Sequence, residues 1–402
     1  MVNRGARGGR FSGPGRFPMP LGVMRPLPFD MQLAADKFER IADYDEATLT
    51  QDVVARATQL TPSEGEKGMV EALQKKIKEL LEKFITTPDS VSGVKIEEVH
   101  EVGSLKKDVV LSGHKVGDLA VVLSTLPTFE LVAALGHKIT DDLRNAGEAV
   151  SFVSHDFGGE IKGSTVSVRL LITTLPKNAA LLEPDLHLSE KLMMINHLSI
   201  RQAEWFTRVS EGSPHKLLVR VLKDVRNRHS GLQPMSSWVV EYLANFCISN
   251  TINHLPLPLG PAFRRFFEIL SAGFLLPGAP ALFDPIDSSF RIGFDISCED
   301  QDKICSTAQT LLRIICSGTP GHKAVLGLDP AFKGKDLTKD VHVWNGIAIS
   351  PLESAYFPDC MKPLFPDEDM DAEGEGRDAE EPQPQTTEGG DVKPDTTSLR
   401  KF

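Results

Sequence analysis

The chain has 402 residues, and 44 Lys and Arg against 55 Asp and Glu give it a formal net charge of −11 at pH 7. No stretch approaches the roughly 20 consecutive apolar residues of a membrane helix, so we expect no membrane span. The five cysteines lack C-x-x-C spacing, which argues against a zinc knuckle or a disulfide framework and fits a reducing compartment such as the nucleus or cytoplasm.

The first segment, residues 1–27, is rich in Arg, Gly and Pro and carries five arginines and no acid. It contains too little apolar surface to fold alone, so we expect it to be disordered. Arg-Gly-rich arms attract phosphates and stack on bases, and phenylalanines lie among these arginines. We therefore expect contacts with RNA, although a solvated tail without function is the alternative. The arginines expected to contact RNA are Arg4, Arg7, Arg10 and Arg16.

Residues 28–187 are predicted to form a first lobe of mixed helices and strands, because periods of 3.6 and 2 alternate along them. Two helices are predicted first: one that Asp45 or Thr48 can cap and that reaches Leu60, and one that opens at 61–64 and runs to about Thr86. A strand over 94–102, a strand from Asp118 and a helix over 128–145 follow. The alternating residues 149–173 then predict two or three antiparallel strands around a turn at Gly158–Gly159.

A pattern that favours phosphate binding lies between the first two strands. Gly103 and Ser104 supply a tight turn with free N–H groups and a hydroxyl, which suit phosphate oxygens. Asp118 heads the buried strand that follows, where a carboxylate could hold a divalent metal against those phosphates. The layout resembles that of nucleotidyltransferases, in which Gly-Ser precedes an Asp-x-Asp or Asp-x-Glu pair. An ordinary turn before a strand is the alternative.

This pattern lacks two of the carboxylates that nucleotidyl transfer by two metal ions requires. The residue two positions after Asp118, on the same strand face, is Ala120. The strand that matches the position of the third carboxylate, 165–173, contains no acid. One carboxylate cannot hold two metals, so we predict a nucleotidyltransferase-like lobe without transferase chemistry. An active template-free nucleotidyltransferase acting on RNA is the alternative.

Residues 188–355 are predicted to form a helical lobe. The predicted helices are Ser189–Ser210, Pro214–His229, Ser236–Ser249, Gly260–Phe274 and Glu299–Ser317, followed by a short mixed tract over 322–350. Lys223, on the second helix, resembles the lysine that template-free transferases offer to a triphosphate. A solvated basic helix face is the alternative.

The span 260–283 carries more large apolar side chains than one helix stripe can bury. The remainder faces either neighbouring helices of the same lobe or a partner protein. On the residues alone both possibilities stay open. The candidates for a dimer interface are Phe266, Phe274, Leu275 and Leu276.

The end of the chain is acidic, with twelve acids and four bases over residues 366–402. We expect residues 365–402 to be disordered. A basic arm and an acidic tail on one chain hint at work on nucleic acid or chromatin.

Segments spread along the chain carry a resemblance to the DZF-domain family, named for the domain associated with zinc fingers. They are EVGSLKK, GHKVGDLAVVL, LPTFELVAALGHK, LLITTLP, LLVRVLKDVR, SAGFLLPG and STAQTLLRI. The resemblance covers essentially the whole chain in the same order. It implies an α+β fold in which a nucleotidyltransferase-like mixed sheet lobe precedes an all-helical lobe, with disordered tails.

The resemblance also implies a partner and a location. Its members pair through the helical half of the domain, which favours an interface within 260–350 and a heterodimer with a DZF-containing double-stranded-RNA-binding protein. RNA and DNA would be bound mainly through that complex, which would regulate transcription and RNA metabolism in the nucleus, with some nucleolar and cytoplasmic presence. No cofactor is required on this view, although Gly103, Ser104, Asp118 and Lys223 could hold a nucleoside triphosphate with one Mg²⁺.

Overall fold

The computed structural model describes residues 45–251, 255–276, 279, 282–352 and 355. The arm over 1–27, with its arginines, and the tail over 365–402 lie outside the described residues. What we predict for those two segments therefore stays a prediction.

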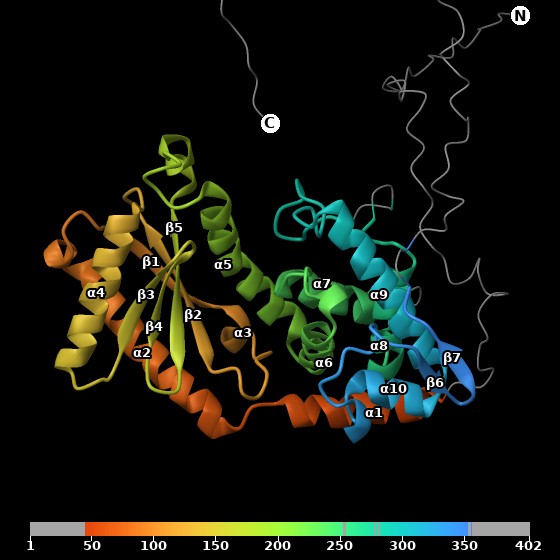
Figure 1. The fold of residues 1–402 in the computed structure, drawn as a ribbon. Coiled ribbons are helices and arrows are strands. Elements are labelled where there is room, and N and C mark those ends of the chain that lie inside the picture. The colour runs from red at the N-terminus through yellow and green to blue at the C-terminus, as the bar shows by residue number, and fades with distance from the viewer. Residues whose placement is uncertain (1–44, 252–254, 277–278, 280–281, 353–354, 356–402) are drawn as a thin grey trace, which may run out of the picture. The chain divides into compact units, whose positions relative to one another are not determined.

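A five-stranded mixed sheet organises the first part of the fold, the sheet lobe (Figure 1). Its strands lie in the order β1-β2-β5-β4-β3, where β2 and β5 pair in parallel and the other neighbours pair antiparallel. The strands are β1 Ile96–Val102, β2 Val116–Leu123, β3 Ser151–His155, β4 Gly158–Lys162 and β5 Ser167–Thr174. The nearly continuous apolar run of β2 predicts a position inside the sheet, because an interior strand is buried on both faces.

Helices cover both faces of the sheet. Helices α2 (Glu64–Thr86) and α4 (Phe129–Asn145) share a core with Leu119 and Val121 on one face. On the other face, α5 (Glu190–Ser210) contacts β1, β2 and β5. Since neighbouring residues of a strand point to opposite faces, Asp118 and Ala120 lie on the α5 face.

The starts of these helices follow capping residues. Ser63 and Glu66 form a reciprocal capping box at α2, and the Thr128 side chain accepts the Leu131 N–H at α4. Such caps satisfy backbone donors that the first turn of a helix leaves free. Sequence patterns of this kind therefore locate helix starts to within a residue or two here.

The predicted turn at Gly158–Gly159 is wrong by two residues, because both glycines lie inside β4. The turn is formed by Asp156 and Phe157. A Cβ on Gly158 would lie 2.4 Å from the Leu170 carbonyl oxygen, and one on Gly159 would overlap the Phe152 ring. The glycines thus allow close approach between strands rather than a reversal of the chain.

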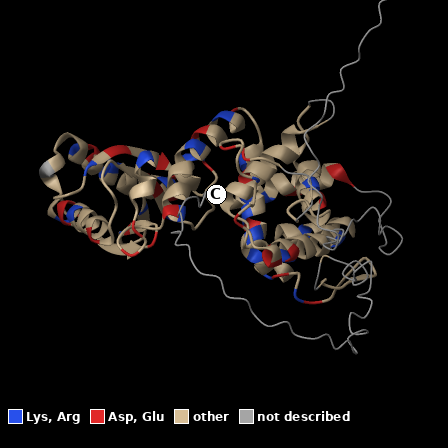
Figure 2. Cartoon of the chain, turned by 90° about the horizontal axis from the view of Figure 1, so that it is seen from above, with Lys and Arg blue, Asp and Glu red and all other residues tan. Residues whose placement is uncertain are grey.

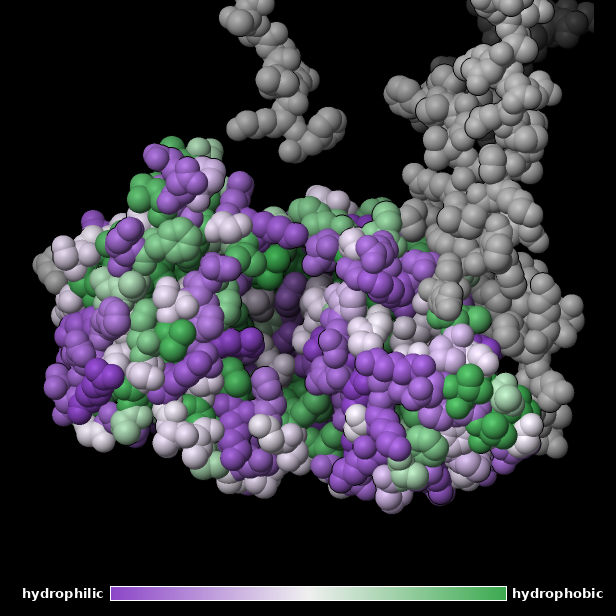
Figure 3. All heavy atoms as spheres, in the orientation of Figure 1, coloured by the Kyte–Doolittle hydropathy of each residue, from purple (hydrophilic) through white to green (hydrophobic). Residues whose placement is uncertain are grey.

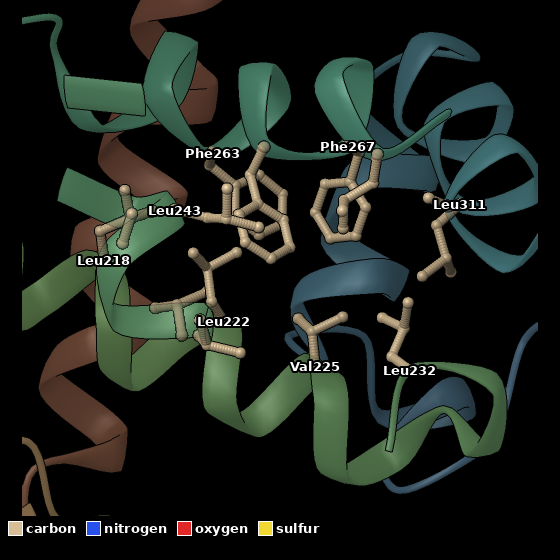
Figure 4. Close-up of a cluster of buried hydrophobic side chains, with 14 of the residues drawn as sticks. Leu218, Leu222, Val225, Leu232, Leu243, Phe263, Phe267 and Leu311 are labelled. Atoms are coloured by element: carbon tan, nitrogen blue, oxygen red, sulfur yellow. The ribbon is translucent and has the colours of Figure 1, made fainter. Parts of the chain in front are cut away.

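The second part of the fold, the helical lobe, is built around α6, α7, α8 and α9 (Figures 1 and 4). Its helices after α5 are α6 His215–Arg228, α7 Ser237–Ser249, α8 Leu259–Ser271, α9 Cys298–Cys316 and α10 Thr319–Leu326. A hairpin of β6 His342–Trp344 and β7 Ile347–Ile349 follows. Short 3₁₀ turns occupy Pro88–Ser90, Pro176–Leu181, Ser230–Leu232 and Pro330–Phe332.

Apolar residues of α8 point into the centre of this lobe, where Phe263 and Phe267 meet Leu222 and Val225 of α6 (Figure 4). Three of the four residues expected at a partner interface are also internal: Phe266, Leu275 and Leu276 are buried, and only Phe274 is half-buried. They face neighbouring helices of their own lobe because several helices converge on α8. The count of apolar residues shows how much must be buried, but not what covers it.

Helix α1 (Glu46–Leu60), which Asp45 caps, precedes the sheet lobe in sequence but packs on the helical lobe. It contacts α6, α8 and α10, and its buried Leu49 and Val53 belong to the core of that lobe. The sequence pattern groups these residues with the sheet lobe instead. The periodicity of α1 predicts which face is buried but gives no information about the partner of that face.

The loop between the short helix α3 (Gly103–Lys106) and β2 packs against the helical lobe. Val109 in this loop is fully buried in the core of the helical lobe. Beside it, the Asp108 carboxylate accepts hydrogen bonds from Lys67 of α2 at 2.8 Å and from Arg220 of α6 at 3.0 Å. The two lobes are therefore held together by an apolar insertion and an ion-pair cluster.

Within the described residues, no helix has the length and apolarity that crossing a bilayer requires.

Candidate ligand cleft between the lobes

A cleft of about 310 Å³ lies between the sheet lobe and the helical lobe. The space-filling view shows a hollow between the two lobes (Figure 3). One wall comes from α3, β2 and β5 and the other from α7 and the segment 284–295, with α5 between them. The predicted residues Gly103, Ser104 and Asp118 line this cleft.

Gly103 and Asp118 are in direct contact at the inner end of the cleft. A Cβ placed on Gly103 would lie only 2.0 Å from Asp118 Oδ2, and Gly103 also has a φ of +74°. Val102 pairs with Asp118 across β1 and β2, which brings the residue after Val102 onto the carboxylate. Glycine is therefore required here both for its backbone conformation and for the space it leaves to Asp118.

The Asp118 carboxylate is paired with a cation that the sequence pattern did not predict. Arg169 stands opposite Asp118 in the parallel β2–β5 register, and its Nε lies 2.6 Å from Asp118 Oδ1. The Asp118 side chain is only 4% exposed, whereas that of Arg169 is 41% exposed, so the buried carboxylate is covered by a guanidinium that still reaches water. Burial alone would lower the pKa of Arg169, but the hydrogen bond and charge of Asp118 outweigh it and raise that pKa. Arg169 thus occupies the strand on which nucleotidyltransferases carry a further acid.

Ala120, where an active transferase would have its second acid, is fully buried. It belongs to a small apolar cluster with Val102 and with Ala203 of α5. Within the described part of the chain, no group of three or more His, Cys, Asp or Glu side chains is arranged to hold a metal ion.

Lys223, the lysine that the resemblance to transferases would offer to a triphosphate, lies next to the Gly-Ser turn. Its Nζ donates to Ser104 Oγ at 2.8 Å. The same ammonium lies 3.1 Å from Oε1 of Glu241, a residue of α7 that is 0% exposed. Lys107, at the end of α3, donates to the other carboxylate oxygen at 2.5 Å. One buried carboxylate thus bridges two buried lysines.

Burial and charge act in opposite directions on this cluster. Burial raises the pKa of Glu241, but the charges and hydrogen bonds of Lys107 and Lys223 outweigh it and bring the pKa below its ordinary value. Burial lowers the pKa of Lys223, and Glu241 offsets part of this effect. Glu241 therefore carries its negative charge at neutral pH, and the lysines are engaged inside the protein.

Charges along the rest of the cleft do not favour a polyphosphate. Five of the lining residues are acids and three are bases, and each of Asp118 and Glu241 is already paired. Arg291 donates to the backbone oxygens of Phe274 and Leu276 and so points into the protein. The acids are Asp118, Glu241, Asp284, Asp287 and Asp295, and the bases are Lys107, Arg169 and Arg291.

The structure thus brings together Gly103, Ser104, Asp118 and Lys223, the four residues predicted from sequence for a nucleotide site. It adds Lys107, Arg169 and Glu241, which that prediction missed. A sequence signal for two of them exists: Arg169 is the lone charge in the apolar strand SVRLLITT, and Glu241 is the lone charge in the apolar helix SWVVEYLANFCIS. A single charge in a buried element needs a partner elsewhere in the fold.

Known proteins match the chain in sequence and in fold. A family model of the DZF N-terminal domain matches residues 17–211, and a model of the DZF C-terminal domain matches residues 214–350. CdnC of E. coli MS115-1, solved in complex with HORMA-deltaN, is 16% identical with a TM-score of 0.51, covering 70% of this chain and 96% of CdnC. Cid1, described as an RNA terminal uridylyl transferase, is 13% identical with a TM-score of 0.50, covering 70% of this chain and 97% of Cid1.

The likeness to CdnC and Cid1 is one of fold, since identities of 13–16% carry nothing more. It agrees with the mixed sheet lobe followed by a helical lobe. The two family models together span most of the sequence, and they meet at residues 211–214, the connection between α5 and α6. The chain therefore belongs to the DZF family, and its fold is that of a nucleotidyltransferase-like sheet lobe joined to a helical lobe.

Proposed function

We propose that the protein is a non-catalytic member of its fold, a subunit that heterodimerises with a DZF-containing double-stranded-RNA-binding protein and regulates transcription and RNA metabolism in the nucleus. The observation that carries the non-catalytic part is the pair formed by Asp118 and Arg169. A carboxylate that is paired with a guanidinium at 2.6 Å offers its charge to that cation rather than to a metal. Ala120 leaves the neighbouring position without an oxygen ligand.

Two-metal transfer requires ligands that hold both ions near the attacking and the leaving oxygen. Here Asp118, the acid that faces the cleft from β2, is paired with Arg169, and β5 thus contributes a cation in place of an acid. These features support a cleft that has lost transfer chemistry. The wild-type cleft would accordingly hold a nucleoside triphosphate with one Mg²⁺ weakly at most, and no cofactor is needed for the fold.

A primer-extension assay tests the catalytic part of the proposal. The full-length protein, alone and with its partner, is incubated with an RNA primer, labelled triphosphates and Mg²⁺ or Mn²⁺, and Cid1 serves as the positive control. We expect no extension. Extension that Asp118→Ala abolishes would instead support the alternative, an active template-free transferase.

The partner part of the proposal draws on family membership and on apolar surface in the helical lobe. Among the described residues, Phe283, Val341 and Val343 are 54%, 59% and 66% exposed. All three lie within the span 260–350 in which the resemblance places pairing, and exposed apolar side chains of this kind are what an interface buries. We assign the contact to these exposed positions instead of the buried Phe266, Leu275 and Leu276.

Co-expression with a DZF-containing double-stranded-RNA-binding protein tests this assignment. Size-exclusion chromatography with light scattering should give a heterodimer, and the chain expressed alone should be poorly soluble. Val343→Asp should weaken the heterodimer, whereas Val54→Asp, at an exposed apolar position of α1, should leave it intact. A soluble monomer that does not pair, or equal effects of the two substitutions, would contradict the proposal.

A further inference from the structure

We propose that Glu241 acts as a built-in anion that pairs with Lys107 of the cleft wall and with the adjoining Lys223, and so excludes polyphosphates from the cleft. This inference rests on the proposed function only in taking the cleft to be a former phosphate site. It goes further by naming one residue that decides which ligands the cleft accepts.

The geometry around Glu241 is that of an anion site already filled. Lys107 and Lys223 approach its two carboxylate oxygens at 2.5 and 3.1 Å, and Ser104 Oγ accepts a hydrogen bond from the same Lys223 ammonium. Lysine and serine beside a Gly-Ser turn are groups that hold phosphate oxygens in proteins. In this protein a side chain from α7 supplies the negative charge that such groups attract.

The carboxylate is buried together with its two cations. Glu241 Oε1 is fully buried and lies 3.1 Å from the Lys223 ammonium. Glu241 is also one of the residues that line the cleft, as are Lys107 and Ser104. The buried cluster is therefore at the cleft wall, where a ligand of the same charge could replace it.

Glu241 is the one charged residue of an otherwise apolar buried helix. The buried residues next to it on α7 are apolar, including Val240 and Leu243, and form part of the lobe core. Burying a carboxylate in such a place is costly unless cations accompany it. Two lysines and one glutamate give the cluster a net positive charge. Glu241 supplies most of the negative charge that compensates the two lysines.

Replacing the charge should therefore convert a closed site into an open one. In Glu241→Gln, Lys107 and Lys223 would remain buried without a counter-charge, which destabilises the fold. A polyphosphate that enters the cleft would supply the missing charge and restore stability, because a ligand that binds only the folded state raises the apparent stability. Wild-type protein should show a much weaker dependence.

The experiment measures thermal unfolding of the full-length protein, in complex with its partner, at increasing concentrations of sodium tripolyphosphate and of ionic-strength-matched sodium chloride. Glu241→Gln should melt below wild type in chloride and gain Tm with tripolyphosphate, with an apparent Kd at least tenfold lower than that of wild type. Glu204→Gln, at an exposed position of α5, makes the same change of charge away from the cleft and should behave as wild type.

A double variant identifies the site of any effect. Lys107→Met combined with Glu241→Gln removes one ammonium together with the carboxylate, so the tripolyphosphate response should largely disappear. A response of Glu241→Gln no larger than those of wild type and Glu204→Gln overturns the inference, as does a response that persists in the double variant. If Glu241→Gln is insoluble, its refolding yield is compared with and without tripolyphosphate. A yield that tripolyphosphate does not change would also overturn the inference. The primer-extension assay on wild type tests the proposed function separately.

Discussion

Gly103 is the residue at which backbone conformation and side-chain packing of the cleft meet. A methyl group there would collide with Asp118 as well as strain the left-handed backbone. Gly113 provides a matched control, because it has a similar φ of +83° but a Cβ added to it would meet no atom within 4 Å. We expect Gly113→Ala to cost about 1 kcal/mol and Gly103→Ala more than about 3 kcal/mol in the free energy of unfolding, measured by chemical denaturation. Equal losses would show that the contact with Asp118 is unimportant.

His229 makes stability depend on pH. Burial lowers its pKa from 6.5 to about 4, and Arg228 also lowers it, while the Val225 carbonyl, Asp336 and Asp224 act in the opposite direction. Because the unfolded state takes up the proton first, this contribution to stability is complete above pH 6.5 and is lost as the pH falls towards 4. The loss amounts to roughly 3 kcal/mol at most.

His229→Asn provides the test of this pH dependence, since its amide can still donate to the Val225 carbonyl. The free energy of unfolding of this variant should fall less between pH 6.5 and 4 than that of wild type. His100→Asn, at a more exposed position, should retain the wild-type slope. If the His229 variant keeps the full slope, another group is responsible.

At the scale of single residues, the sequence predicts some of the side chains at the cleft. Gly103, Ser104, Asp118 and Lys223 were predicted because each belongs to a local pattern of known use. Arg169 and Glu241 were missed because their roles depend on pairing across β2 and β5 and on the packing of α7 against α6. No local pattern carries either relation, although a lone charge in a buried element is a warning of one.

Helix α1 shows at the scale of elements how one segment stabilises a lobe that is distant in sequence. Leu49 is fully buried against the helical lobe, whereas Val54 on the same helix is 40% exposed. Leu49→Ala should lower the free energy of unfolding by about 2–4 kcal/mol, and Val54→Ala by less than about 0.5 kcal/mol. All three tryptophans, Trp205, Trp238 and Trp344, lie in α5, α7 and β6, so their fluorescence reports on the helical side of the molecule. Similar losses for the two variants would mean that α1 is not part of that core.

Most helices and strands could be predicted because caps and periodicity are local properties. Helix α10 was not distinguished within the predicted mixed tract over 322–350, because its eight residues are too few to show a clear period. The position of α1 on the helical lobe and the internal burial of α8 were likewise out of reach. Both depend on contacts between elements far apart in the chain.

On the scale of the whole molecule, the folded part offers little attraction to nucleic acid. Lys and Arg lie interspersed with Asp and Glu over the described elements (Figure 2). The five arginines of residues 1–27 stand without an acid among them. We therefore expect deletion of residues 1–26 to remove most of the affinity of the isolated subunit for single-stranded RNA.

Salt dependence of binding gives the measurement. The affinity of the full-length protein should fall as salt rises, and for five phosphate contacts the slope of log K against log salt should be no steeper than roughly −3.5. The slope of the truncated protein should be much flatter. Replacing the same arginines by lysine should keep most of the slope. Unchanged affinity after truncation would place RNA on a folded surface.

The position of α1 has a consequence for synthesis on the ribosome. Its apolar face emerges first, but the helices that cover it begin only at His215, after the entire sheet lobe has been made. At 5–20 residues per second, that face waits on the order of ten seconds or more without its partner. During this interval α1 is a natural target for chaperones, and ribosome-bound chains stalled before residue 215 should be captured through it.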